Sequence, residues 1–206
     1  LIENCLFGNN VGTKVGALHV RSSNISIIKS SFINNTFQLL FSFKNIDQAF
    51  PSTKVRASDI LVEESSAEQV SLIEILFCLF SISDNGISIA VYKYFKVFLA
   101  ENEFKGSSAS GIFVFSAETS IKNSSFSGLV ADEGAALKFF NFETVRIKRL
   151  VIIDSFFLHC SSKLGGALLL QGFIDARIVS TKFLNIKADG FPGIAGAVYF
   201  ICLVCN

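Results

Sequence analysis

One internal repeat constrains this chain more than any other feature. Each copy ends on a large apolar residue, usually phenylalanine. A small polar residue stands two positions earlier, and apolar residues stand five and seven positions earlier in the clearest copies. The clearest is ISIIKSSF at 25–32, where Phe32 follows Ser30, Ile27 and Ile25. The other copies end at Phe7, Ile60 (a weaker copy), Phe80, Phe104, Phe126, Phe157 and Phe183. A repeat of about 24 residues predicts an architecture of stacked units.

A second element accompanies most copies, namely a short apolar run that begins with glycine. Examples are GALHV at 16–20, GIFVF at 111–115 and GALLL at 166–170. In the first element, the spacing of two between apolar residues is that of a strand with one buried face. Such a unit cannot bury its apolar face alone, whereas a stack of similar units can. We therefore predict an all-β fold: a single-stack parallel β-helix (β-solenoid) of about eight coils of roughly 24 residues.

The repeat also sets the expected domain organisation. We expect one β-helix domain over residues 1–206, with irregular coils and longer loops at 38–72, where the pattern is weakest. A β-sandwich is the alternative for short β-rich runs, but it gives no reason for one pattern to recur at fixed offsets. The chain has no methionine and begins and ends within the pattern. Because solenoids need polar caps, we expect this chain to be a piece of a longer protein.

Composition narrows the classes of partner. Half of the residues are hydrophobic, 23 are phenylalanine and the formal net charge is +1. This balance gives no electrostatic field for steering nucleic acid, so we expect no nucleic-acid partner. No clean apolar run of about 18 residues is present, so membrane attachment is expected only through a segment outside this chain. At both open ends we expect further copies of the chain or flanking coils to pair with the edge strands.

Three Asn-x-Ser/Thr sequons make N-linked glycans a further expected partner. They begin at Asn24, Asn34 and Asn123, all at positions where the repeat predicts solvent-exposed turns. Exposed sequons favour a secreted protein, and we expect an extracellular or cell-surface location.

The five cysteines are scattered along the chain. Cys5 and Cys78 occupy the small polar position of the repeat, where a small buried thiol is expected. Cys202 and Cys205 form a lone CxxC, which has no second pair or histidine ligands to complete a zinc site. Cys160, Cys202 and Cys205 remain candidate disulfide cysteines if the protein lies in an oxidising compartment.

No catalytic arrangement is visible in the register of the repeat. Enzymes built on β-helices that cut polysaccharides need carboxylates or basic groups gathered over adjacent coils, often with bound Ca²⁺. Asp175 and Arg149 share one position in neighbouring coils and are expected to form a surface ion pair. His19 and His159 lie far apart in register, so no Ser-His-Asp arrangement is expected. We predict no catalytic residues, no metal site and no cofactor.

Two motifs carry a family resemblance. The FxxN turns from Phe7 to Asn10 and from Phe32 to Asn35, together with GGAL at 165–168, resemble the FxxN and GGA[IL] repeats of polymorphic outer-membrane proteins. The wider superfamily is the pectate-lyase-like right-handed parallel β-helix. The resemblance implies a surface or extracellular β-helix that serves in adhesion or as a passenger rod.

Three functional hypotheses follow. The leading one is a non-catalytic structural or adhesive β-solenoid module of an extracellular or cell-surface protein, capable of assembling into a fibre or fibril. The second is a carbohydrate-active β-helix enzyme, a polysaccharide lyase or hydrolase, whose site residues lie outside this chain. The third is the ectodomain stalk of a membrane protein. An acidic cluster in neighbouring coils would favour the second, and an apolar span beyond Asn206 would favour the third.

Overall fold

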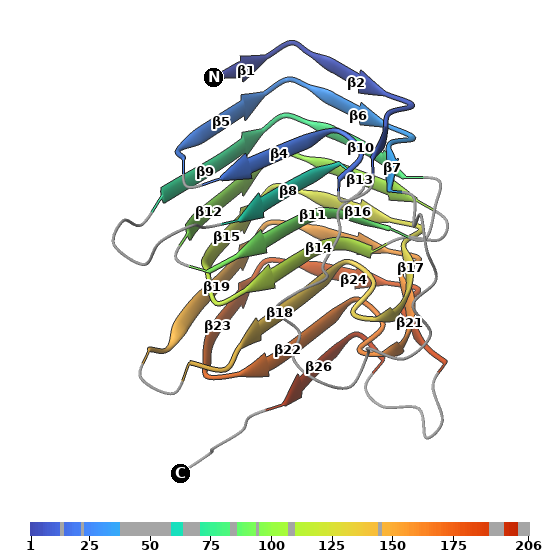
Figure 1. The fold of residues 1–206 in the computed structure, drawn as a ribbon. Coiled ribbons are helices and arrows are strands. Elements are labelled where there is room, and N and C mark those ends of the chain that lie inside the picture. Colours follow the sequence, from blue (N-terminus) through green and yellow to red (C-terminus); the bar gives the residue numbers. More distant parts are fainter. Residues whose placement is uncertain are drawn as a thin grey trace, which may run out of the picture.

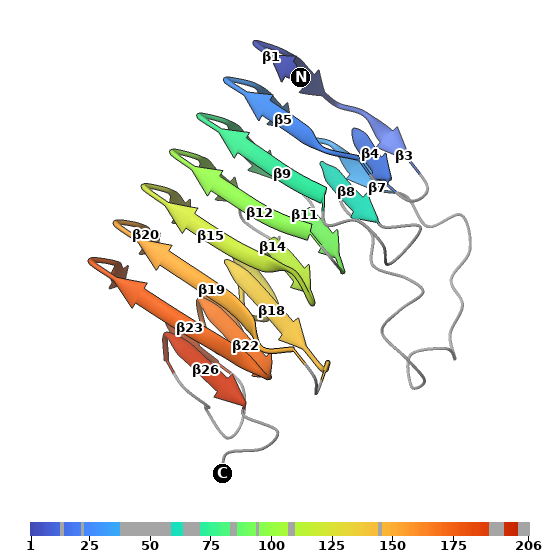
Figure 2. The ribbon, with the colours of Figure 1, turned by 90° about the vertical axis from the view of Figure 1, so that its left-hand side faces the viewer.

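The fold is that of a computed structural model, in which three parallel sheets form the walls of a stack of coils (Figures 1 and 2). The structure describes residues 1–12, 15–21, 23–37, 59–63, 71–82, 86–93, 95–106, 110–143, 146–189 and 196–201. The described residues contain no helix that is long and apolar enough to cross a membrane.

Each of the three main sheets has seven strands, and each coil contributes one strand to each sheet. Sheet 1 contains β1 (Ile2–Glu3), β5 (Ile25–Ile28), β9 (Ser71–Leu76), β12 (Phe95–Ala100), β15 (Glu118–Lys122), β19 (Lys148–Ile153) and β23 (Ile174–Val179). Sheet 2 contains β2 (Leu6–Gly8), β6 (Ser31–Ile33), β10 (Leu79–Ile82), β13 (Glu103–Gly106), β16 (Ser125–Ser127), β20 (Phe156–Leu158) and β24 (Lys182–Leu184).

Sheet 3 holds the glycine-led strands that the sequence predicts. It contains β4 (Leu18–Arg21), β8 (Ile60–Glu63), β11 (Ile87–Tyr92), β14 (Ser110–Phe115), β18 (Leu137–Asn141), β22 (Leu168–Gly172) and β26 (Val198–Ile201). Two small sheets lie between sheets 2 and 3 along the chain. One contains β17 (Val130–Glu133), β21 (Ser161–Leu164) and β25 (Lys187–Ala188), and the other contains β3 (Val11–Gly12) and β7 (Thr36–Phe37). The predicted parallel β-solenoid is confirmed.

The repeated phenylalanines form one continuous column in the core. Phe7 pairs in register with Phe32, and Phe32 pairs with Phe80. The column continues through Phe104, Phe126, Phe157 and Phe183. Neighbouring rings are stacked, with centroids 4.6 to 5.0 Å apart. This separation matches the spacing of hydrogen-bonded strands, so pairing of the strands also stacks the rings.

Ile60 corrects one detail of the sequence prediction. It was expected to end a weaker copy of the repeat, in the same position as the phenylalanines. Instead it lies in β8 of sheet 3, in register with Leu18 and Ile89. The phenylalanine column therefore has seven members, and the described residues form seven coils where the sequence predicts about eight. Residues 38–58 and 64–70 of the predicted irregular coil lie outside the described residues.

The turn between sheets 1 and 2, here called the first corner, has the same backbone conformation in every coil. The residue three positions before each phenylalanine has a positive φ, between 46° and 56°. These residues are Asn4, Lys29, Phe77, Glu101, Asn123, Asp154 and Ser180. All of them are solvent-exposed. The left-handed conformation turns the chain sharply, so the small polar residue that follows points into the core.

Candidate functional site

A ladder of small polar side chains lies inside the first corner. The backbone N–H of each such residue points along the stack and needs an acceptor. The next coil supplies it: Ser30 Oγ accepts from Cys5 N at 3.2 Å, and Asn102 Oδ1 accepts from Cys78 N at 2.9 Å. Ser124 Oγ and Ser155 Oγ continue the ladder. The small polar residue of the repeat thus satisfies a buried donor.

The same hydroxyl groups also satisfy a carbonyl in their own coil. Ser124 Oγ donates to Lys122 O and Ser155 Oγ donates to Ile153 O, both at 2.9 Å. Asn102 Nδ2 reaches into the preceding coil and donates to Ile75 O at 2.8 Å. A small side chain that both donates and accepts fits this position, which explains the preference for serine, threonine, asparagine and cysteine.

A second network, buried except at its outer end, joins the asparagine turns to sheet 3. Asn10 Nδ2 donates to Asn35 Oδ1 at 2.8 Å, which links two stacked turns. Asn35 Nδ2 in turn donates to Phe7 O and to Asp59 Oδ1, each at 2.9 Å. Ser88 Oγ donates to the other carboxyl oxygen of Asp59. Four side chains from three coils are therefore linked.

Asp59 is the one aspartate or glutamate in the described core. Its side chain is almost completely buried. Burial raises its pKa to about 6, although the hydrogen bonds from Ser88 and Asn35 oppose this shift by favouring the carboxylate. Asp59 could not be recognised from the sequence, because the weaker copy of the repeat that ends at Ile60 assigns this segment to the wrong sheet.

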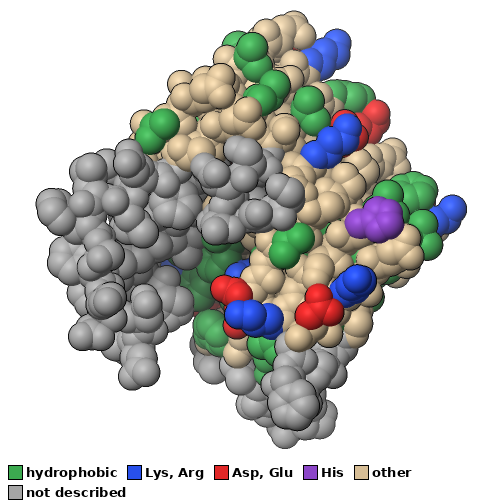
Figure 3. Space-filling model, turned by 90° about the vertical axis from the view of Figure 1, so that its right-hand side faces the viewer, with side chains coloured by type: hydrophobic (Ala, Val, Ile, Leu, Met, Phe, Trp, Pro, Cys, Tyr) green, Lys and Arg blue, Asp and Glu red, His purple; other side chains and the backbone are tan. Residues whose placement is uncertain are grey.

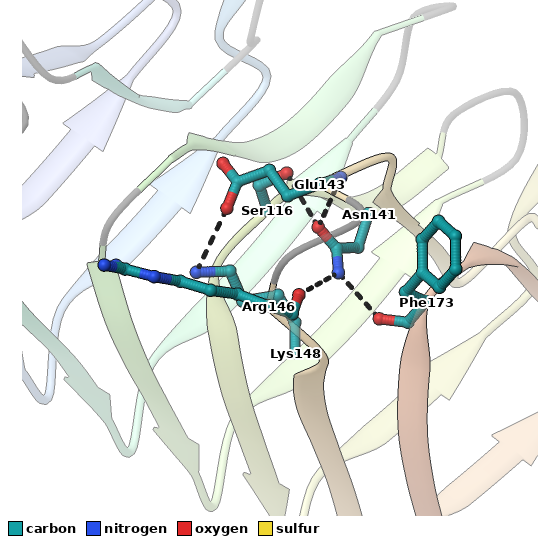
Figure 4. A network of polar contacts seen from close by, with 6 residues as sticks. All are labelled: Ser116, Asn141, Glu143, Arg146, Lys148 and Phe173. Atoms are coloured by element: carbon teal, nitrogen blue, oxygen red, sulfur yellow. Dashed lines mark hydrogen bonds and ion pairs between the residues drawn. The ribbon is translucent and has the colours of Figure 1, made fainter.

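Asn141 is the centre of a third network, at the turn from sheet 3 to sheet 1 (Figure 4). Its Oδ1 accepts from Ser116 Oγ at 3.1 Å and from Glu143 N at 3.2 Å. Its Nδ2 donates to Arg146 O at 2.8 Å and Phe173 O at 2.6 Å. All four hydrogen-bonding sites of the amide are used, so Asn141 holds the loop after β18 against the neighbouring coils.

An ion pair stands beside this network. Lys148 Nζ lies 3.7 Å from Glu143 Oε2, and the lysine side chain is only 10% exposed. Glu143 Oε1 is buried without a hydrogen-bond partner. The carboxylate offsets the cost of burying the lysine charge. This pair could not be predicted from the sequence, because the loop that carries Glu143 does not recur in other coils.

The outer surface carries charges that alternate in sign. Asp132 and Lys163 lie side by side on β17 and β21, with Asp132 Oδ1 2.8 Å from Lys163 Nζ. This contact lowers the pKa of Asp132 and raises that of Lys163. Asp189 follows in the next coil and accepts from Ser161 Oγ at 3.0 Å. Figure 3 shows acidic and basic side chains next to each other on this side of the molecule.

Sheet 1 carries a similar row on its outer face. Lys96 is in register with Glu118, and Arg149 is in register with Asp175. The predicted surface ion pair is confirmed, with Arg149 Nε 3.4 Å from Asp175 Oδ2 and both side chains exposed. Such pairs contribute little stability individually, but they remove like-charge repulsion between stacked coils.

The histidines lie apart, as the register predicts. His19 Nε2 is 2.9 Å from Glu63 Oε2 on the outer face of sheet 3. His159 lies at the turn after β20, with a φ of 53°. Within the part of the chain that the structure describes, no three His, Cys, Asp or Glu side chains gather in a way that could hold a metal ion.

All three sequon asparagines are exposed. Asn34 and Asn123 have φ values of 51° and 46°, so both project from tight turns. Asn24 Oδ1 accepts a hydrogen bond from Leu72 N at 2.7 Å, which leaves its Nδ2 atom for attachment of a sugar. The three sites lie at separate turns of the coils, so they form no common cluster.

The described cysteines differ in how far they are buried. Cys78 is a free buried thiol in the corner ladder, as predicted, whereas Cys5 is exposed because its coil lies at the end of the described stack. Cys160 is also a free buried thiol, with its Sγ near the carbonyl oxygens of Phe126 and Leu158. Cys202 and Cys205 lie outside the described residues.

No protein-family model, curated protein or solved structure matches the chain. The fold is established by the strand pairing itself, and the resemblance to particular β-helix repeats stays a hypothesis.

Proposed function

We propose that this chain is a non-catalytic structural or adhesive β-solenoid module of an extracellular or cell-surface protein. The proposal rests on the observation that the polar side chains form hydrogen bonds and ion pairs that join neighbouring coils. The corner ladder, the Asn10–Asn35–Asp59–Ser88 network and the Asn141 network all join one coil to the next. Ion pairs such as Asp132–Lys163 and Arg149–Asp175 join coils on the outside.

The extracellular location rests on the sequons. Asn24, Asn34 and Asn123 are all exposed, so each is accessible to a glycan without loss of a core contact. The fold also agrees with the proposed kinship to right-handed, pectate-lyase-like β-helices with FxxN and GGA[IL] repeats. The resemblance implies that such rods serve in adhesion or as passenger domains.

The proposed partners at the ends are coils of the same pattern. The described stack ends in edge strands: β1, β2 and β4 on one side and β23, β24 and β26 on the other. Phe7 and Phe183 are the outermost members of the phenylalanine column, and both are partly exposed. A flanking coil or another copy that supplies one more phenylalanine would extend the stack, which in repetition gives a fibre.

The test uses protein secreted from a eukaryotic host. Intact mass is measured before and after enzymatic removal of N-glycans, for the natural sequence and for Asn24→Gln, Asn34→Gln and Asn123→Gln variants. A mass loss that disappears with particular substitutions supports the proposal. Secreted protein of unglycosylated mass would remove the support for an extracellular role. Hydrolysis or eliminative cleavage of polysaccharides by the same preparation would refute a non-catalytic role.

A further inference from the structure

Phe77 is an unusual residue for the first corner. The other corner residues are asparagine, aspartate, serine, lysine and glutamate, whereas Phe77 places a large aromatic side chain there, 49% exposed. Its φ is 55°, a conformation that bulky side chains rarely adopt and that asparagine tolerates best. Strained residues of this kind are retained where the side chain has a use.

The residues on either side of Phe77 in the stack carry opposite charges. Backbone hydrogen bonds fix the order along the corner, because Lys29 N donates to Leu76 O and Phe77 N donates to Ala100 O. Lys29 therefore lies one coil before Phe77, and Glu101 lies one coil after it. Both side chains are exposed, and neither is in an ion pair among the described residues.

The neighbouring row of sheet 1, formed by the residues that directly precede the corner residues, also has opposite charges on either side of an apolar residue. Leu76 is its central residue, half-buried and beside Phe77. Two coils before it stands Glu3, through the register Glu3–Ile28–Leu76, and two coils after it stands Lys122, through Leu76–Ala100–Lys122. Glu3 and Lys122 are also exposed and free of ion pairs in the described part of the chain.

We propose that this edge binds a second copy of the chain in an antiparallel, two-fold symmetric dimer centred on Phe77. The two-fold axis lies in the plane of the contact, next to Phe77, and runs perpendicular to the stack. It places each row of residues against the same row of the second copy, with the order of coils reversed. Phe77 then faces Phe77 of the second copy, and Leu76 faces Leu76. Lys29 faces Glu101 and Glu3 faces Lys122, each twice.

The charged residues and the apolar residues of this edge are thus both complementary to the same edge of a second copy. All four charged groups meet the opposite charge, and the two apolar residues meet at the axis. Reversal of the coil order is required: in a parallel alignment of the same rows, Lys29 would face Lys29 and Glu101 would face Glu101. Electrostatic complementarity of this kind selects orientation more than it adds affinity.

The contact differs from extension of the stack at its ends. It uses a side of the rod and closes as a dimer, whereas pairing of end strands is open and gives larger assemblies. Among the described coils the overlap covers five, about 20 Å of rod along a narrow edge, so this contact lies well below the roughly 1,200 Å² of stable complexes. We therefore expect a weak dimer, with a dissociation constant in the micromolar range or above.

The register also relates this surface to one sequon. Asn123 follows Glu101 in the first corner and faces Asn4 of the second copy at the edge of the contact. A glycan on Asn123 would occupy that space. Dimerisation is therefore expected for protein without this glycan and not for protein that carries it.

The test is sedimentation velocity of glycan-free protein at about 10 to 500 µM, a range that spans a weak dimer. We expect a monomer–dimer equilibrium that weakens as NaCl rises from about 0.05 to 0.5 M. Lys29→Glu should weaken the dimer at least tenfold, and the exchange Lys29→Glu with Glu101→Lys should restore it. Asp154→Lys is the matched control, because it reverses a charge at the same corner position in a coil that faces none of the described coils, and it should change nothing.

A second pair of variants separates binding from folding. Phe77→Asn should abolish the dimer while the melting temperature of the monomer stays equal or rises, because asparagine suits the left-handed corner. Phe77→Cys should form an intermolecular disulfide on mild oxidation, and Asp154→Cys should not. A monomer at every concentration, a dimer that tolerates Lys29→Glu, failure of the charge exchange to restore it, or equal cross-linking at position 154 would each overturn the proposal.

Discussion

The ring of Phe32 stacks on the ring of Phe80, with centroids 5.0 Å apart and planes inclined by 8°. The two residues are 48 positions apart, about twice the usual repeat, yet they occupy neighbouring coils because β6 pairs directly with β10. The core column is thus uninterrupted where the sequence pattern is weakest.

The phenylalanine column predicts that alanine substitutions at the adjacent residues Phe157 and Phe156 reduce stability by very different amounts. Phe157 is fully buried within it, whereas Phe156 in the same strand is 47% exposed, with Lys182 Nζ 5.3 Å from its ring centroid. Phe157→Ala should reduce the free energy of unfolding by about 3–5 kcal/mol, because it leaves a cavity between two rings. Phe156→Ala should cost less than about 1.5 kcal/mol. Urea denaturation measures both, and equal losses would contradict the assigned register.

The sequence was sufficient to predict the phenylalanine column, because residues equivalent to Phe32, Ser30 and Ile27 recur at fixed offsets in the other copies. Each offset corresponds to one position in the coil. The sequence was insufficient at Ile60, where Ser58 and Val55 imitate the same spacing by chance. Only the pairing of Ile60 with Leu18 and Ile89 decides between the two positions. Local spacing cannot reveal which sheet a strand joins when the connection before it varies in length.

The polar networks follow from the repeat only in part. The Asn10–Asn35 contact does so, because both asparagines stand three residues after a phenylalanine of the column. Asp59, Ser88 and Asn141 each serve one turn and have no counterpart at a fixed offset. Their roles follow from contacts between coils, which the repeat alone does not specify.

The corner ladder predicts which substitutions position 124 tolerates. Ser124 Oγ accepts from Asn102 N at 3.2 Å. Ser124→Ala leaves that buried N–H without an acceptor and should cost about 1–3 kcal/mol of unfolding free energy. Ser124→Thr should cost clearly less, because threonine keeps the hydroxyl and stands at the equivalent position 181. Denaturant titration of both variants checks this, and equal losses would show that packing rather than the hydrogen bond decides.

Asp59 predicts a stability that falls as the pH rises. Its pKa is about 6 in the folded protein and 3.8 in an ordinary environment. Between these values the folded state binds more protons than the unfolded state, so the free energy of unfolding decreases with rising pH and levels off above about 6. The loss should amount to about 3 kcal/mol, at roughly 1.4 kcal/mol per pKa unit.

Asp59→Asn should remove this part of the pH dependence, measured by denaturation at several values from pH 4 to pH 8. Asp132→Asn is the control with the opposite sign, because contact with Lys163 lowers the pKa of Asp132. Its contribution is present at neutral pH and lost as the pH falls. An unchanged slope in Asp59→Asn would mean that Asp59 is not buried as described.

Gly172 predicts a strict requirement for glycine. Its φ is 109°, and a Cβ atom there would collide with the carbonyl oxygen of Asn141. Gly172→Ala should therefore unfold the protein or cost more than about 3 kcal/mol, since both the backbone and the Asn141 network must move. Gly196→Ala is the matched control, because a Cβ atom there meets nothing within 4 Å. Thermal melts of the two variants should differ widely, and similar melting temperatures would contradict this close approach.

The cysteines predict a reactivity order that reports on the stack. Burial raises the pKa of the Cys78 thiol, and it raises that of Cys160 to about 11, so neither forms much thiolate at neutral pH. Cys5 is exposed and should react first with iodoacetamide. Brief alkylation of native protein, followed by peptide mass spectrometry, should label Cys5 and spare Cys78 and Cys160. In denaturant all three should react alike, because the protection comes from the packed coils. Labelling of Cys160 in native protein would indicate local opening between β20 and β21, or a register different from the one that buries its sulfur.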